Sequence, residues 1–165
     1  MSAANLASIF TVMPVLAKAG DDFEIDTRTT DIRAAETRAA VNASGGAVNY
    51  VKALAREFTK QLPKQLDEST NLIGAAANET QFTLMYRLQK NRSKEDFERT
   101  ATGYQRYTTR EICFCPEGSV LINEFDVTYR YIYFNKTGKN LFAFSIDKAA
   151  SDELQTPIQY RKGGR

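Results

Sequence analysis

The sequence predicts an α+β fold: an antiparallel sheet of about four strands with helices packed on one face, in the order α-β-β-α-β-β. Two runs of β-branched and aromatic residues flank the turn Asn135-Lys-Thr-Gly138, which is typical of a β-hairpin. Two segments, 47–62 and 93–115, carry apolar residues at three- and four-residue spacing, which indicates amphipathic helices. Each helical segment precedes a pair of predicted strands, so both helices can cover the same sheet.

The composition fits one globular domain and argues against several functions. The chain has 165 residues and a formal net charge of +2, without the basic excess that marks most nucleic-acid binders. It has no histidine, the commonest general base and metal ligand. No phosphate-binding loop, nucleophile motif or metal-protease motif occurs. We therefore expect no nucleic-acid partner, no metal, no cofactor and no catalytic residues.

The N-terminal residues form a separate apolar segment. Residues 6–17 are apolar and are followed by Ala17-Lys-Ala19, which resembles the apolar region and cleavage site of a secretory signal peptide. No Lys or Arg precedes the run, so the signal pattern is incomplete, and the run is too short for an ordinary transmembrane helix. The alternative is an apolar helix that packs on the domain or contacts a membrane through residues 6–17.

The first half of the chain then reads as a linker, two helices and two strands. An acidic, polar stretch covers 21–32, and an Ala-rich helix is predicted over 33–43. The helix over 47–62 ends before Pro63, because the residue before a proline avoids the helical region. A weak strand over 71–77 and a stronger one over 80–89 follow, the second because its apolar and polar residues alternate.

The second half repeats this order. Ser93 is a good N-cap for the helix that extends to Cys115, and Pro116 closes it. Residues 117–124 form a short turn or helix before the hairpin. After Ile146 the chain becomes polar and reads as a loose tail. The predicted regions are an apolar segment 1–20, a linker with an Ala-rich helix 21–46, an α+β domain 47–151 and a C-terminal tail 152–165.

The hairpin supplies the candidate site. Tyr129, Tyr131 and Tyr133 share one face of its first strand, where aromatic residues most often pack against covering helices. The other face is also partly apolar, and a domain of this size cannot easily bury both. An apolar patch left open often marks an interface. We therefore predict a partner-binding surface for another protein, a second copy of the chain or residues 6–17, made of Arg130, Ile132, Phe134 and Phe142.

The two cysteines, Cys113 and Cys115, are not a disulfide scaffold. Near a helix end they point in different directions, so a bond between them would be strained. We expect one buried and one half-exposed thiol.

Several short segments from Leu62 onward form a recognisable set. They are Leu62-Pro63, Asp67-Glu-Ser-Thr70, Phe82-Thr-Leu-Met-Tyr86, Tyr104-Gln-Arg, Cys113 three residues before Pro116, Tyr129-Arg-Tyr131, Asn135-Lys-Thr-Gly138 and Phe144-Ser-Ile146. In these segments, over roughly its last hundred residues, the chain resembles the Vibrio-type pilotin lipoproteins of type II secretion and related small bacterial envelope proteins of unknown function.

The resemblance implies a non-enzymatic module that recognises a segment of a partner protein, in the periplasm or cell envelope. Two departures matter. The family pairs the helix cysteine with a second one after the last strand, where this chain has Ser151. The lipid-bearing cysteine after the signal peptide is also absent around residues 17–20. The alternative is therefore a small cytoplasmic accessory or inhibitor protein, phage- or plasmid-borne, with the same fold.

Overall fold

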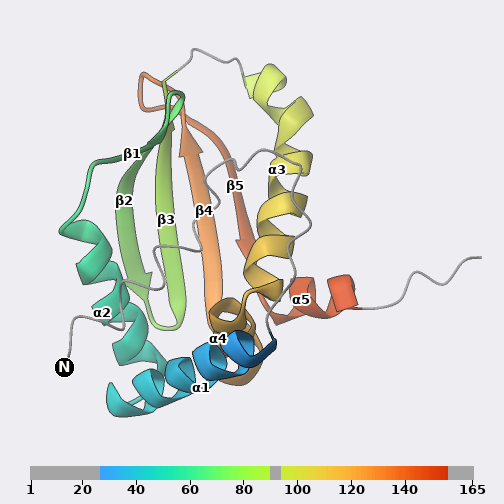
Figure 1. Ribbon diagram of the computed structural model, residues 1–165. Coiled ribbons are helices and arrows are strands. Elements are labelled where there is room, and N and C mark those ends of the chain that lie inside the picture. Colours follow the sequence, from blue (N-terminus) through green and yellow to red (C-terminus); the bar gives the residue numbers. More distant parts are fainter. Residues whose placement is uncertain (1–26, 90–93, 156–165) are drawn as a thin grey trace, which may run out of the picture.

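Five strands form one mixed sheet, in the order β1-β2-β3-β4-β5 (Figure 1). This computed structural model describes residues 27–89 and 94–155. The strands are β1 Lys64–Asp67, β2 Thr70–Asn78, β3 Gln81–Leu88, β4 Thr128–Phe134 and β5 Asn140–Ile146. The helices described with them are α1 Thr27–Ala43, α2 Ala47–Thr59, α3 Lys94–Phe114, α4 Pro116–Phe125 and α5 Lys148–Gln155. The α+β class is therefore as the sequence predicts.

The sheet differs from the prediction in strand number and in direction. The additional strand, β1, is short, and its only strongly apolar residue is Leu66, so it shows no alternation. It turns back onto β2 where Asp67 Oδ1 accepts hydrogen bonds from the Ser69 backbone N–H (2.6 Å) and hydroxyl (2.8 Å). The expected all-antiparallel sheet is wrong as well, because β3 and β4 are parallel. Between them α3 and α4 carry the chain back along the sheet, and such a crossover returns the next strand in the same direction.

The core lies on one face of this sheet. There Phe82, Leu84 and Tyr86 of β3 align with the tyrosines of β4, and all of these side chains are buried. From α2, the Phe58 ring meets that of Phe82 edge to face at a centroid distance of 5.3 Å. α3 contacts β5, and α4 lies between α3 and α1 (Figure 1).

The ends of the described region contain more helix than the patterns indicated. α1 begins at Thr27, within the segment read as a linker, and α5 includes residues 152–155 of the expected tail. The Asp147 carboxylate caps α5 by accepting from the Ala150 N–H at 3.0 Å. The apolar residues 6–17 lie outside the described residues. Within the described part, no helix has both the length and the hydropathy that crossing a membrane requires.

A sharp turn between α3 and α4 places the second helix under the sheet. Cys115 is the N-cap of α4: its Sγ accepts from the Gly118 N–H at 3.2 Å and donates to the Ile112 carbonyl at 3.3 Å. A Cβ on Gly118 would lie 2.1 Å from that carbonyl oxygen, so only glycine fits there. Pro116 follows the cap at the first helical position, where its missing N–H costs nothing.

Candidate functional site

The open face of the sheet carries three of the four residues predicted to bind a partner. Arg130, Ile132 and Phe134 alternate with the buried tyrosines of β4, so they point to the side opposite the core. Arg130 is exposed, while Ile132 and Phe134 are half-buried. We call this side of the sheet the open face, because among the described residues the core cluster lies on the other side.

The strand register extends these residues into rows. In the middle row Met85 and Ile132 are opposite one another on β3 and β4, flanked by Gly74 on β2 and Ala143 on β5. A Cβ on Gly74 would come within 2.8 Å of the Met85 terminal methyl, so the methionine side chain lies over the glycine. This row is a continuous apolar band across four strands.

Arginines flank the apolar band. Arg130 lies beside Thr83 of β3 on one side, and Arg87 of β3 lies beside Phe134 on the other. Strands β2 to β5 contain no Asp or Glu. The open face therefore combines an apolar centre with positive charge, a composition that suits an amphipathic partner segment with acidic residues.

Phe142, the fourth predicted residue, is on the opposite face. It pairs with Tyr133, and its ring lies 5.6 Å from that of Phe144 on the covered side. The register shifts between Tyr133 and Phe134, which leaves Leu141 as an extra residue on β5. Phe142 alternates with Phe144 and Ile146 as in a regular strand, so it shares their covered face, and the bulge affects only the residues before it.

The tyrosines of β4 pack within the core. Tyr131 stacks on Tyr86 of β3 and on Phe144 of β5, with centroid distances of 6.0 and 5.0 Å. Burial raises the pKa of the Tyr131 phenol well above its ordinary value. These phenols therefore stay protonated at neutral pH, and their role is packing.

A partly buried polar cluster lies near Tyr129, at the start of β4. Glu117 at the start of α4 is 7% exposed, and Arg33 of α1 binds its carboxylate through two hydrogen bonds of 2.6 and 2.9 Å. Burial raises the pKa of the nearby Tyr50 phenol and of the Cys115 thiol, each to about 12. Neither group is therefore a nucleophile at neutral pH, and the structural role of the cluster is the ion pair that joins α1 to α4. In the described ranges, no three or more Cys, Asp or Glu residues converge as metal ligands would.

This cluster predicts a loss of stability at alkaline pH. The ordinary pKa values of Cys115 and Tyr50 are 9.0 and 10.0. A pKa raised by folding contributes stability below the unfolded value, and that stability is lost as pH rises toward the folded value. The urea midpoint should therefore fall between about pH 9 and pH 12. Cys115→Ser should make the fall shallower, because serine also caps a helix but does not titrate there. An equally steep fall in both proteins would contradict the assignment.

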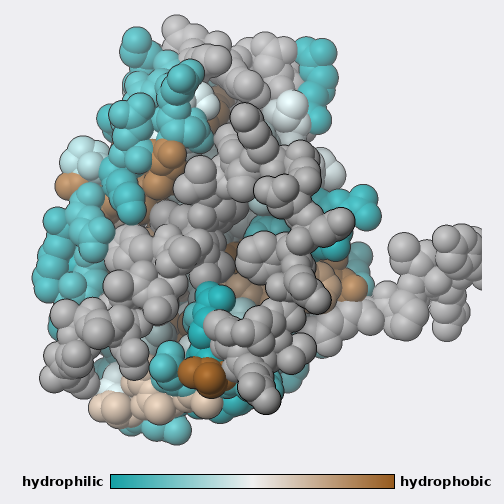
Figure 2. Space-filling view, in the orientation of Figure 1, coloured by the Kyte–Doolittle hydropathy of each residue, from teal (hydrophilic) through white to brown (hydrophobic). Residues whose placement is uncertain are grey.

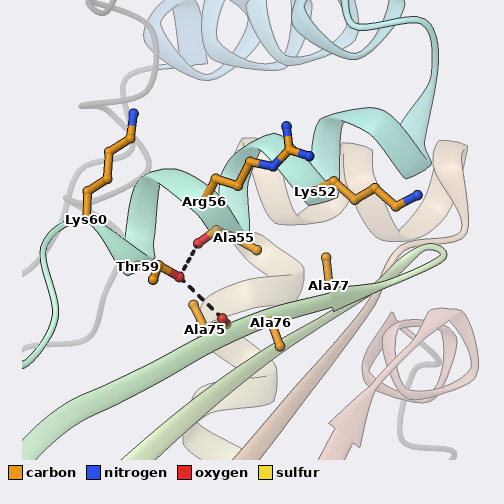
Figure 3. Close-up of a pocket in the computed structure, with 8 residues that line it drawn as sticks. All are labelled: Lys52, Ala55, Arg56, Thr59, Lys60, Ala75, Ala76 and Ala77. Atoms are coloured by element: carbon orange, nitrogen blue, oxygen red, sulfur yellow. Dashed lines mark hydrogen bonds between the residues drawn. The ribbon is translucent and has the colours of Figure 1, made fainter.

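A second surface, which the sequence analysis did not single out, lies at the outer edge of β2. An open groove of about 430 Å³ separates α2 from this strand (Figure 3). β2 contributes Ala75, Ala76 and Ala77. The other wall is Ala55, Thr59 and the cations Lys52 and Arg56 of α2, together with Lys60, the residue that caps its C-terminus. The cations recur every four residues and therefore share one side of α2. Hydrophilic side chains are visible along the edge of the molecule where α2 lies (Figure 2). The four-residue spacing was a readable signal, but nothing in the sequence placed it beside a strand edge.

Comparisons with known proteins show a likeness in fold to solved structures. No family model matches the sequence, and no curated protein matches it. A Pseudomonas aeruginosa protein described as secreted, solved by crystallography, has a TM-score of 0.56 and 12% identity, over 64% of this chain and 92% of its own. Two type II secretion pilotins are also similar: AspS of Vibrio cholerae, with a TM-score of 0.48 and 14% identity, and EpsS of Vibrio vulnificus, with 0.49 and 11%. They match over 70% and 71% of this chain and 96% of each pilotin. Pilotins are thus among the solved structures that this chain is similar to, as the sequence resemblance predicted, and at these identities the likeness concerns the fold.

Proposed function

We propose that this chain is a non-enzymatic module of the cell envelope that recognises a segment of a partner protein on its open face, as an accessory to secretion. The observation that carries the proposal is the apolar band through Met85 and Ile132, flanked by Arg87 and Arg130, on a sheet face opposite the helices. Such a face supports binding of an amphipathic segment. The description of one structural neighbour as secreted, and of two others as secretion pilotins, supports the envelope and secretion parts.

A photo-crosslinking experiment tests the binding surface. A photoreactive amino acid at Ala143, which is exposed on the open face, should crosslink a partner in cells of the native host. The same group at Asn42, exposed near the end of α1, is the matched control and should give no such product. Arg130→Glu combined with Phe134→Ser should reduce the crosslink at Ala143 at least about tenfold, because central contacts dominate interface energies. Equal products at both positions, or none at Ala143, would refute the open face as the interface.

Deleting residues 1–20 distinguishes an external partner on the open face from coverage of that face by the chain's own residues 6–17. If the apolar segment 6–17 covers the open face, the shortened chain should bind a hydrophobic dye or self-associate, and Phe134→Ser should reverse this. If an external partner is the ligand, the deletion should leave dye binding unchanged. Dye binding that appears on deletion and depends on Phe134 would therefore show that the open face is covered by the chain's own segment, and the partner proposal would be wrong.

The cytoplasmic accessory protein remains the second candidate, and one observation favours it. Cys113 and Cys115 are both free, and the family cross-link is replaced by a hydrogen bond between Cys113 and Ser151. Structural disulfides mark oxidising compartments, so their absence suits a reducing one. Fractionation of cells that express the tagged full-length chain distinguishes the two, because intact chain found only in the cytosol would exclude the envelope proposal.

A further inference from the structure

The outer edge of β2 is only partly covered by its neighbour. β1 pairs with Thr70, Asn71 and Leu72, and among the described residues no strand pairs with the outer side of β2 beyond that point. The remaining stretch, Gly74 to Asn78, is half-buried or exposed. An uncovered strand edge presents backbone donors and acceptors to which another chain can add.

The hairpin register shows which backbone groups point outward. Asn78 and Gln81 close the two-residue turn between β2 and β3, so they form a hydrogen-bonded pair. Opposed residues alternate between bonded and non-bonded pairs, so Ala75 and Ala77 point their N–H and C=O groups away from β3. The Ala75 carbonyl does accept a bond on that side, from the Thr59 hydroxyl, at a long 3.4 Å (Figure 3). The same hydroxyl also donates to the Ala55 carbonyl at 2.8 Å. The longer contact can therefore be replaced by a hydrogen bond from an incoming strand to the Ala75 carbonyl.

The charges along this edge favour a negatively charged ligand. Lys52, Arg56 and Lys60 line the groove, and Glu57, which pairs with Lys60 at 2.5 Å, is the only acidic residue in α2. The three cations span about 12 Å of helix, close to the length of four strand residues. The small side chains of Ala75 and Ala77 leave space between the helix and the strand. If two copies of the chain met edge to edge, their rows of cations would repel each other, so the charge argues against a second copy as the ligand.

We propose that the β2 edge binds an extended acidic segment of a partner protein, which adds to the sheet as a sixth strand beside Ala75 and Ala77. Its backbone groups bond those of Ala75 and Ala77, and its acidic side chains on the helix side neutralise Lys52 and Arg56. This groove lies at the edge of the sheet and is separate from the open face. The proposal therefore goes beyond the proposed function, and either can fail while the other holds.

Amide NMR of the full-length chain tests the proposal with a defined probe. The probe is a short capped peptide with glutamate at alternate positions and threonine or valine between them. Its addition at low salt should shift the Ala75 and Ala77 amide signals and slow their hydrogen exchange. Affinity should fall steeply with added salt. A peptide with lysine in place of glutamate should not bind. Absence of binding by the acidic peptide, or shifts confined to the open face, would overturn the proposal.

Charge reversals with a matched control identify the groups responsible. Lys52→Glu with Arg56→Glu should weaken the acidic peptide at least about tenfold, because each reversal replaces attraction with repulsion. Lys136→Glu with Lys139→Glu makes the same charge change in the exposed β4–β5 turn and should leave affinity within about twofold, because exposed charges that far from the peptide are screened. All four side chains are exposed, so both variants should fold. Equal loss in the two variants would show non-specific charge attraction and refute the site.

One further variant asks whether the chain occupies its own groove. Asp21, Asp22, Glu24 and Asp26 form an acidic segment ahead of α1. If the Ala75 and Ala77 amides are already protected in the free chain, and neutralising these four residues to Asn and Gln exposes them, the occupant is this segment. The partner proposal would then be wrong. Unprotected amides in the free chain, with protection only when the peptide is added, support it.

Discussion

Replacing Phe58 with alanine is expected to lower the free energy of unfolding by about 3–5 kcal/mol. The Phe58 side chain is 2% exposed and meets Phe82, whose ring in turn lies 6.0 Å from that of Tyr129. Removing it leaves a cavity between α2 and two adjacent strands, and neighbours that are themselves packed relax little into such a space. Urea unfolding followed by circular dichroism measures the change.

Two further variants, one at an exposed and one at a buried position, serve as comparisons for Phe58→Ala. Phe114→Ala removes the same ring from a site that is 56% exposed, so it should cost less than about 1 kcal/mol. Ile112→Ala, at an 8% exposed position of α3, should cost about 2–5 kcal/mol. If the urea midpoint stayed at the wild-type value in both Phe58→Ala and Ile112→Ala, the assignment of the buried helix faces would be incorrect.

Ser151→Cys is expected to restore the cross-link that the pilotin resemblance implies and to raise the free energy of unfolding by up to about 2–4 kcal/mol. Ser151 is fully buried in α5 and is hydrogen-bonded to Cys113 of α3. The two side chains are thus neighbours, as a disulfide requires. The bond would close a long loop and so restrict the unfolded chain.

The rate at which this variant oxidises depends on the ionisation of the Cys113 thiol. Burial raises the pKa of Cys113, so little thiolate is present at neutral pH and the bond should form slowly there or during refolding. Mass spectrometry after digestion should show a peptide linked between positions 113 and 151. Ser151→Cys combined with Cys113→Ser is the control and should gain no stability on oxidation. A link to Cys115 instead, or only free thiols, would contradict the position of α5 on α3.

Local sequence patterns predicted α2, α3, the strands β2 to β5 and the buried side of β3 and β4, whereas β1, α5 and the N-terminal part of α1 were missed. Alternation on β3 and β4 identified the covered face, and the spacing over 47–62 identified the buried side of α2, because these periodicities follow from the local geometry of strands and helices. The sequence also brought Arg130, Ile132 and Phe134 together, since alternate residues of one strand necessarily share a face. Their role in binding stays a prediction.

The way these elements meet depends on the tertiary structure. Direction and register depend on contacts between distant residues, so local patterns did not show that β3 and β4 are parallel or that a bulge at Leu141 interrupts β5. For the same reason the pairing of Arg33 with Glu117, 84 positions apart, has no signal in the sequence. The groove beside Ala75 and Ala77 arises because β1 is shorter than β2 and leaves part of its edge uncovered, and strand length is set by pairing, which local residue preferences do not encode.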